Sequence, residues 1–293
     1  MNVLKPAPPA DGAAPRIEED EPAWVANTTA RRYRIGVNSL RVLLFVVLTG
    51  GWELGADLGW IDPFFFGQPT TIVRQIGIWA TQGTAQGSLW EQIAVTLEET
   101  VLGFAIGVVL GIVFGVLLGR SRLLADILGP YIKAANSIPR IVLGSIFVIA
   151  LGLGMASKVA LAVVLVFFIV FFNAFQGVRE VDRNILANAR ILGASPRQLS
   201  TQVIIPSALS WIIASLHTSF SFALVGAVVG EYLGAIKGLG LLISTAQNTF
   251  NANGVFAAMV ILAVVSLTAE ALVTVLENRL IRWRPNTITD VSI

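Results

Sequence analysis

Few residues in this sequence could carry chemistry, and their types exclude most catalytic and metal-binding sites. The chain has no cysteine and a single histidine, His217, so disulfides, thiolate metal sites, Cys nucleophiles and histidine pairs are excluded. None of its lysines is followed by Ser or Thr, which rules out a GxxxxGKS/T phosphate-binding loop, and the segments GAIKGLG and GVVLGIVFG are glycine-rich without that motif. HExxH and GxSxG motifs are also missing. We therefore expect no metal, no cofactor and no covalent catalysis on this chain.

One long polar stretch, NARILGASPRQLSTQVIIPSAL at 188–209, separates two apolar segments in the second half of the chain. ILANARIL is typical of a helical turn that Gly193 would end, and SPRQLSTQV is typical of a second helix. Ser195 can cap this second helix, with Pro196 at its first position. The pattern predicts helix, glycine turn and helix, with the chain entering the next apolar segment at Pro206.

The composition indicates an integral membrane protein. Hydrophobic residues make up 55% of the chain and charged residues 13%, and the mean hydropathy is +0.76. The formal net charge is only +2, and the basic residues are scattered, so we do not expect binding to nucleic acid.

Six apolar segments are candidates for helices that span the bilayer, because about 20 apolar residues are needed to cross it. They lie near residues 36–58, 92–119, 139–153, 157–177, 207–233 and 254–281. The third is short, and Pro130 and Pro139 are expected to bend or break the helix around its inner boundary. We predict an all-α membrane protein of six transmembrane helices in a lipid bilayer.

The basic residues determine the orientation of this arrangement. With the N-terminus inside, 17 of the 20 Lys and Arg lie on the cytoplasmic side and 3 lie outside. Positive charge resists translocation, so both termini are predicted to be cytoplasmic. We divide the chain into a flexible cytoplasmic tail at 1–34, a transmembrane domain at 35–285 and a short C-terminal tail at 286–293, because residues 1–34 are rich in proline and acidic residues.

Small polar residues recur every three to four positions along the segment 207–233, which places them on one helix face. This polar stripe consists of Ser207, Ser210, Ala214, His217, Thr218 and Ser221. Such a stripe either lines a polar passage or forms hydrogen bonds between helices. The candidate passage residues are Ser210, His217, Thr218 and Ser221. His217 could relay protons or bind an anion, but we favour a hydrogen bond to a neighbouring helix.

Glutamates lie within the apolar segments, where an unpaired carboxylate is costly. We expect Glu270 to form a structural pair near the cytoplasmic end of its segment rather than to contact substrate. Glu98, Glu99 and Glu231 lie towards the outer ends of their segments. Their position fits either a solvated surface or the docking of an external protein, and the sequence does not decide between these roles.

Glycines recur every four residues along one face of the second segment. They are Gly103, Gly107, Gly111, Gly115 and Gly119. This small-xxx-small spacing lets two helix backbones approach closely. We therefore predict helix packing, within one subunit or between two, rather than a ligand site.

The polar stretch carries a more specific signal. Ala189, Gly193, Val203, Ile205 and Pro206 match the spacing of the EAA loop, which reads Glu-Ala-Ala, three residues, Gly, nine residues and Ile-x-Leu-Pro. This loop belongs to the permease subunits of ABC importers, which the chain resembles. Segments from 137, 228 and 253 are similar to the nitrate, sulfonate and taurine branch of that family. Ala187 and Asn188 stand where the family has its glutamate and first alanine.

The resemblance implies a fold, partners and a function. The fold would be the type I importer permease fold, and residues 178–206 would form the coupling loop that docks on the ATPase. The loop residues implied are Ala189, Arg190, Leu192, Gly193, Ala194, Ser195 and Pro206. Two permease copies, as a homodimer, would form the pathway in the bacterial inner membrane. Two cytoplasmic ATPase subunits would hold ATP and Mg²⁺.

A periplasmic or tethered binding protein would deliver the solute, and the permease itself would not be an enzyme. Nitrate, taurine, sulfonates, bicarbonate or a pyrimidine vitamin precursor are the substrates implied. The alternative is a secondary transporter driven by an ion gradient, which ought to show inverted repeats and several charges in the middle of the membrane.

The charge bias makes the orientation testable by labelling single engineered cysteines. Labels at Arg122, Arg197 and Arg284 should be accessible only from the cytoplasm, and labels at Gln82 and Asn251 only from outside. Modification of the Gln82 position from the cytoplasm would contradict the six-span map.

Overall fold

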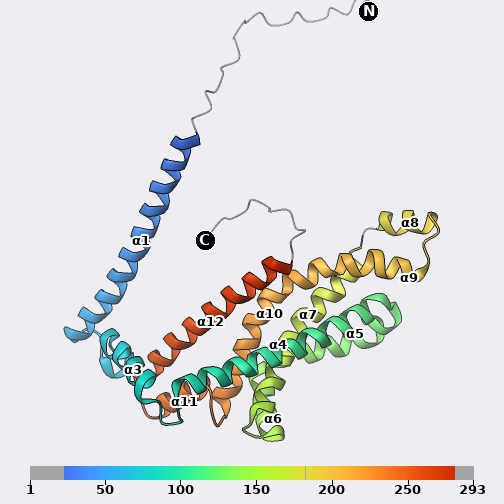
Figure 1. The fold of residues 1–293 in the computed structure, drawn as a ribbon. Coiled ribbons are helices and arrows are strands. Elements are labelled where there is room, and N and C mark those ends of the chain that lie inside the picture. Colours follow the sequence, from blue (N-terminus) through green and yellow to red (C-terminus); the bar gives the residue numbers. More distant parts are fainter. Residues whose placement is uncertain (1–22, 182, 281–293) are drawn as a thin grey trace, which may run out of the picture. The chain divides into compact units, whose positions relative to one another are not determined.

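The computed structural model describes residues 23–181 and 183–280, and its regular elements are helices (Figure 1). The contacts within the chain define two units, residues 1–55 and residues 56–293. The helices in chain order are α1 (Ala23–Asp57), α2 (Pro63–Phe66), α3 (Pro69–Gln82), α4 (Leu89–Arg120), α5 (Arg122–Asn136), α6 (Arg140–Leu151), α7 (Met155–Arg179), α8 (Arg183–Ile191), α9 (Pro196–Gln198), the π-helix η1 (Leu199–Ile204), α10 (Ile205–Leu233), α11 (Leu239–Asn248) and α12 (Ala252–Leu280).

The first unit is represented by α1. This helix begins at Ala23, inside the stretch 1–34 for which the sequence predicts a flexible tail. Its apolar part, Tyr33–Asp57, corresponds to the first predicted span. Residues 1–22 lie outside the described part of the chain, as do the predicted C-terminal tail 286–293 and Arg284.

Within the described residues, five helices are long and apolar enough to cross a membrane. They are Tyr33–Asp57, Leu89–Arg120, Met155–Arg179, Pro196–Leu233 and Ala252–Val275. A sixth candidate is the pair α5 and α6, which bends by 88° at the break. Pro139 caps α6 at this break, whereas Pro130 lies inside α5. The predicted all-α membrane fold is confirmed, and the break expected around the third span occurs at Pro139.

Helix α7 packs against α4 along a row of very close contacts. The five glycines of α4 face Ala162, Val166, Val170, Ala174 and Val178 of α7, in that order. A Cβ atom at Gly103 would lie 2.3 Å from the Cβ of Ala162, which no side chain could tolerate without a shift. Because both series increase in steps of four, the two helices run in the same direction. The glycine stripe is therefore covered within one chain.

Helix α10 packs on α7 in the opposite direction. A Cβ at Gly226 would lie 2.6 Å from the Cα of Ala162, and one at Gly230 would lie 3.1 Å from the Cα of Lys158. Near the other end of the pair, Gly177 of α7 closely approaches Ala208 of α10. The helices α4, α7 and α10 thus form a core in which small residues set the helix spacing.

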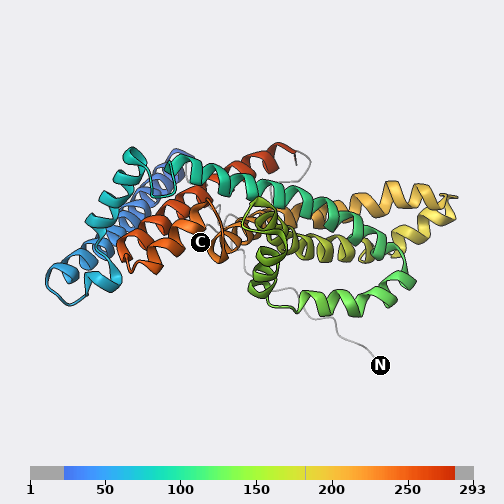
Figure 2. The same ribbon diagram turned by 90° about the horizontal axis from the view of Figure 1, so that it is seen from below.

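Helix α11 joins α12 to this core. Leu239 and Leu242 of α11 are buried in a cluster with Leu89 of α4 and Ile261 of α12, against which Trp79 of α3 also packs. Figure 2 shows α3, α11 and the beginning of α12 at the same end of the second unit, with α5 and α8 at the other. The segments predicted to be external therefore lie together.

Contacts between segments far apart in sequence support this grouping. Gln86 donates a hydrogen bond to Thr245 (3.4 Å), and the Gln68 amide donates one to Asn253 (3.0 Å). We refer to this end as the outer end, following the orientation that the charge bias predicts.

The close approach of α4 and α7 predicts a large effect from one added carbon. In Gly111→Ala, the new Cβ would lie 2.7 Å from the Cβ of Val170 and 3.1 Å from the carbonyl of Phe167. Overpacking of this kind costs about 1–3 kcal/mol. Thermal unfolding of the purified protein, followed by size-exclusion chromatography, should show a lower midpoint.

Gly77→Ala is the matched control. Gly77 is an exposed helical position with no atom within 4 Å of the added Cβ, so alanine there should be neutral or slightly stabilising. Equal midpoints for the two variants would contradict the packing described for α4.

Candidate functional sites

The predicted coupling loop begins with α8, which ends at a glycine. Gly193 has a φ of 82°. The amide of Ala194 donates to the carbonyl of Ala189 (3.0 Å), and the amide of Gly193 donates to that of Arg190 (3.0 Å). These two bonds with a left-handed glycine form a Schellman motif, which satisfies carbonyls at a helix end. The glycine turn is therefore required by backbone geometry.

The chain restarts as a helix immediately after this turn. The Ser195 hydroxyl accepts a hydrogen bond from the Gln198 amide (3.3 Å), and the Gln198 side chain accepts one from the Ser195 amide (2.8 Å). Together they form a capping box, with Pro196 at the first position. The direction change between α8 and α9 is thus closed by hydrogen bonds on both sides of Gly193.

The second helix differs from the short one predicted. Pro196–Leu233 is continuous, so the polar residues after Ser195 extend the fifth span instead of forming a separate helix. Pro206 lacks an amide proton and would clash with the preceding turn of an α-helix. The turn before it is the π-helix η1, in which the Ile205 amide donates to the carbonyl of Ser200. This wider turn accommodates Pro206 without ending the helix.

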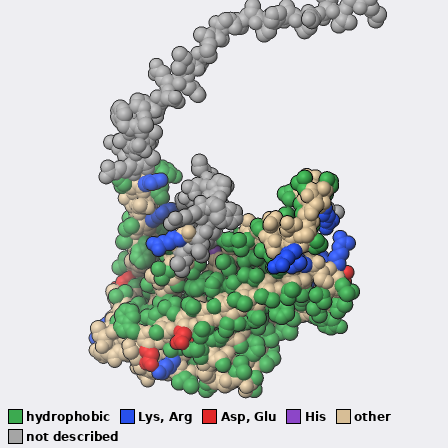
Figure 3. All heavy atoms as spheres, turned by 45° about the vertical axis from the view of Figure 1, so that its right-hand side comes forward, with side chains coloured by type: hydrophobic (Ala, Val, Ile, Leu, Met, Phe, Trp, Pro, Cys, Tyr) green, Lys and Arg blue, Asp and Glu red, His purple; other side chains and the backbone are tan. Residues whose placement is uncertain are grey.

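The end of α8 presents apolar side chains to solvent. Ile191 is 82% exposed and Leu192 is 86% exposed. Arg190 and Arg197 are also exposed, whereas Ala189 and Ala194 are half-buried. Figure 3 shows this projecting end with hydrophobic and basic side chains at its surface. It has the properties of a protein docking site, since large apolar groups are left without a partner in the described residues.

The polar stripe of α10 lies on the side of the helix turned away from α7. Ser210 and Thr218 are exposed, and His217 and Ser221 are half-buried. The buried residues of α10, among them Ala208, Ile212, Ser215, Ser219 and Ala223, form the opposite side. The candidate passage residues therefore face a surface that the chain's own core does not cover.

His217 and Glu270 form a pair across two helices. His217 Nε2 lies 2.9 Å from Glu270 Oε1, and their side chains are 40% and 39% exposed. The sequence predicts a neighbouring-helix partner for His217 and a structural pair for Glu270, and the structure brings these two residues together. Each provides the polar partner that the other needs within an apolar segment.

The expectation of a solvated or docking role for Glu99 and Glu231 is wrong, because both are buried in a third site, a polar cluster at the outer end. Glu231 of α10 is fully buried. Its Oε1 accepts a hydrogen bond from Thr96 of α4 (2.6 Å), and its Oε2 accepts one from the Gly240 amide (2.7 Å). The Leu239 amide donates to Thr96 Oγ1 (2.9 Å). The Leu239 and Gly240 amides lie at the N-terminus of α11. The first amides of a helix have no partner within the helix, and the helix dipole there favours a carboxylate.

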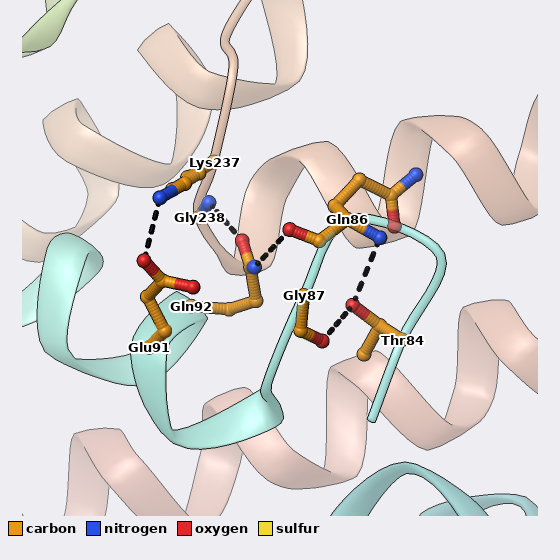
Figure 4. Close-up of polar contacts among 7 residues, drawn as sticks. All are labelled: Thr84, Gln86, Gly87, Glu91, Gln92, Lys237 and Gly238. Carbon is orange, nitrogen blue, oxygen red and sulfur yellow. Dashed lines mark hydrogen bonds and ion pairs between the residues drawn. The ribbon is translucent and has the colours of Figure 1, made fainter. Parts of the chain in front are cut away.

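The same amide cradle extends outwards to the surface. Figure 4 shows Gln92 accepting a hydrogen bond from the Gly238 amide (2.7 Å) and donating one to the Gln86 carbonyl (3.1 Å). Beside it, Lys237 pairs with Glu91 at the surface. The glycine-rich segment GAIKGLG therefore binds a side chain of the same chain, the carboxyl group of Glu231, through the Gly240 amide.

Glycine is needed in this cradle for space. Gly238 has a φ of 120°, and a Cβ there would lie 2.1 Å from Glu231 Oε1. A Cβ at Gly240 would lie 2.3 Å from the carbonyl of Val228. The signal in the sequence was a glutamate followed seven and nine residues later by glycine, but only the fold shows that they meet.

Two further charged residues are buried beside Glu231. Lys158 of α7 is fully buried and donates hydrogen bonds to the carbonyls of Leu153 (2.7 Å) and Gly154 (3.1 Å), beyond the end of α6. Glu99 of α4 is 2% exposed and lies near both Glu231 and Lys158. No three His, Cys, Asp or Glu residues of the described ranges are grouped as a metal site.

Comparison with known proteins places this architecture in a family. Residues 107–282 match the family described as binding-protein-dependent transport system inner membrane component. The riboflavin transport system permease protein of Chloroflexus aurantiacus is 33% identical over 86% of this chain and 92% of that protein. The taurine transport system permease protein of Escherichia coli is 29% identical over 87% of this chain and 91% of that protein. The structure of an amino acid ABC transporter superposes with a TM-score of 0.54 at 20% identity, covering 72% of this chain and 97% of that one.

The chain therefore belongs to the family of inner-membrane permease subunits of binding-protein-dependent ABC importers. This confirms the resemblance carried by the EAA spacing and the multi-pass location in the inner membrane. It gives no support to the alternative of a secondary transporter driven by an ion gradient. The subunit works as the membrane component of a transport system.

The glycine requirement of the cradle can be separated from backbone strain. Gly238→Ala should lower the thermal midpoint more than Gly152→Ala. Both glycines have positive φ, but a Cβ at Gly152 has no atom within 4 Å, so only the backbone cost of about 1–2 kcal/mol applies there. Midpoints that fall equally in the two variants would show that the Glu231 contact adds nothing.

Proposed function

We propose that this chain is one of two permease copies that pass a small solute from an external binding protein to the cytoplasm. Two cytoplasmic ATPase subunits hold ATP and Mg²⁺ and drive the change between outward and inward access. The observation that carries this proposal is the capped elbow at Gly193, at the glycine of the EAA spacing. The chain itself contributes docking surfaces and a pathway rather than covalent chemistry.

The elbow is suited to transmit motion because both of its sides are held by hydrogen bonds. The Schellman motif fixes how α8 ends, and the capping box fixes how α9 begins. The helix from Pro196 then continues into the fifth span without a break. A push on α8 by the ATPase would therefore move the inner end of α10.

The exposed side chains of the elbow indicate how it binds. Ile191 and Leu192 are large apolar groups that would gain about 25 cal/mol for each Å² removed from water in a groove of the ATPase. Arg190 and Arg197 are exposed nearby, while Ala187 occupies the position of the family's glutamate. The contact would thus rely on apolar burial and basic side chains in place of an acidic one.

The polar stripe supports a pathway between two permease copies. Ser210, His217, Thr218 and Ser221 lie on the face of α10 that the chain's own core leaves uncovered. Hydroxyl and imidazole groups lose hydrogen bonds when they face hydrocarbon, and they keep them along a hydrated passage. A homodimer would place two such stripes opposite each other.

The substrate we propose is a small nutrient of the sulfonate and taurine type. One relative is named for taurine. Another of higher identity is named for riboflavin. Since permeases of similar sequence carry different names, the selection of solute would reside mainly in the binding protein. A ligand screen on the binding protein that accompanies this complex would identify the solute.

The coupling role is tested at Gly193. Valine there adds a β-branched side chain at a φ of 82°, which should cost about 1 kcal/mol or more and change the angle of the elbow. Gly193→Val, reconstituted with its ATPase and binding protein, should lose bound ATPase or lose hydrolysis stimulated by the loaded binding protein. Gly193→Ala should have a smaller effect.

Gly59→Val provides the control for backbone strain alone. Gly59 has a φ of 73° and, like Gly193, no atom within 4 Å of an added Cβ, but it belongs to the outer end. It should keep bound ATPase and stimulated hydrolysis. If Gly193→Val retained wild-type ATPase binding, stimulated hydrolysis and uptake, the coupling assignment would be withdrawn.

A further inference from the structure

We propose that Glu99 is a buried proton-binding site, in which one proton joins the carboxyl groups of Glu99 and Glu231 beside the ammonium group of Lys158. The cluster would then contain one negative charge, on Glu231, and one positive charge, on Lys158. This site goes beyond transport itself. It concerns the protonation state that holds the outer ends of α4, α7, α10 and α11 together.

The donors around Glu231 assign the negative charge to it. Its two oxygens accept hydrogen bonds from the Thr96 hydroxyl and the Gly240 amide. The amide is at the start of α11, a ten-residue helix whose N-terminus favours negative charge. Both oxygens of this carboxylate are thus supplied with donors, although the side chain is completely buried.

The surroundings of Lys158 assign the positive charge to it. Its ammonium group donates to two backbone carbonyls beyond the end of α6, and carbonyls are acceptors that favour a cation. Lys158 also interacts electrostatically with the carboxylate of Glu231. A buried lysine without an anion nearby would be costly, so Lys158 and Glu231 compensate each other.

Glu99 has no comparable set of donors. Its Oε2 is buried and has no hydrogen-bond partner among the residues that the structure describes. The Glu99 and Glu231 carboxyl groups are within hydrogen-bonding reach of each other, and Glu98 on the same helix adds negative charge nearby. Two ionised carboxylates in contact repel, whereas a proton on Glu99 makes it a donor to Glu231. The missing donor is therefore the proton of Glu99 itself.

This arrangement predicts which pairs of substitutions restore neutrality. Lys158→Met leaves a buried negative charge, and the thermal midpoint of the full chain in lipid nanodiscs should fall by about 10 °C. Adding Glu231→Gln removes that charge and should recover part of the loss. Adding Glu99→Gln to Lys158→Met should recover nothing, because Glu99 carries no charge. Recovery by Glu99→Gln instead of Glu231→Gln would overturn the proposal.

The single variant Glu99→Gln provides a second, independent measurement. The glutamine amide can donate to Glu231 as a protonated acid does, so the midpoint at neutral pH should stay within a few degrees of wild type. The native protein binds a proton that the unfolded chain releases, so wild-type stability should fall as the pH rises into the alkaline range. In Glu99→Gln, this loss of stability at alkaline pH should be absent.

Glu98→Gln is the matched control, since it removes a neighbouring carboxylate that is not buried in the cluster. This variant should lose nearly as much stability at alkaline pH as the wild type does. If Glu99→Gln lowered the neutral midpoint by about 10 °C, or kept the full alkaline loss, the proton would not be on Glu99. These measurements need only Glu99→Gln and wild type, so they decide the question even if Glu231→Gln fails to fold.

Discussion

The contact between α4 and α7 determines the spacing of the whole helical core. In a bilayer, apolar side chains gain nothing by leaving lipid for another apolar surface, so helices associate mainly through close packing and polar contacts. Glycine at every fourth position of α4 lets its backbone lie against the alanines and valines of α7. Ala162 of α7 also receives Gly226 of α10, so the three helices share one tightly packed centre. Helix α11 and, through it, α12 are built on this core.

The second constraint is that every polar group within these helices must find a partner. Glu231 is buried without losing its hydrogen bonds, because the Gly240 amide at the start of α11 and the Thr96 hydroxyl donate to its carboxyl group. Pro206 is accommodated by a π-helical turn, and His217 and Glu270 satisfy each other. These arrangements join elements distant in sequence, and each replaces contacts that water would otherwise provide. The outer end is consequently a hydrogen-bonded unit, while the inner end of α10 extends as a single helix towards α8.

This division of the molecule suits a transport subunit. A rigid outer end and close-packed core can transmit a displacement applied at the Gly193 elbow, because packed helices move as bodies rather than deforming. The apolar tip at Ile191 and Leu192 is exposed, and the polar stripe of α10 is exposed at Ser210 and Thr218. One would receive a cytoplasmic partner and the other a second copy. The same chain thus separates the surface that receives force from the surface that the solute would pass.

The sequence by itself determined the membrane class, the positions of the spans, the glycine contact face and the turn at Gly193. These are properties of local pattern: hydrophobic length, four-residue spacing, and the caps formed by Gly193, Ser195 and Pro196. It also carried the EAA spacing that identified the family. The continuity of the helix through Pro206 was not predictable, because it depends on a π-turn whose residues have no distinctive signature. Only the tertiary structure decided that Glu99, Lys158 and Glu231 meet, that Gly238 leaves room for the Glu231 carboxyl group, and that Gly240 lies against the backbone of α10. Their spacing along the chain carries no information about distance in space, because three separate helices and a loop bring them together.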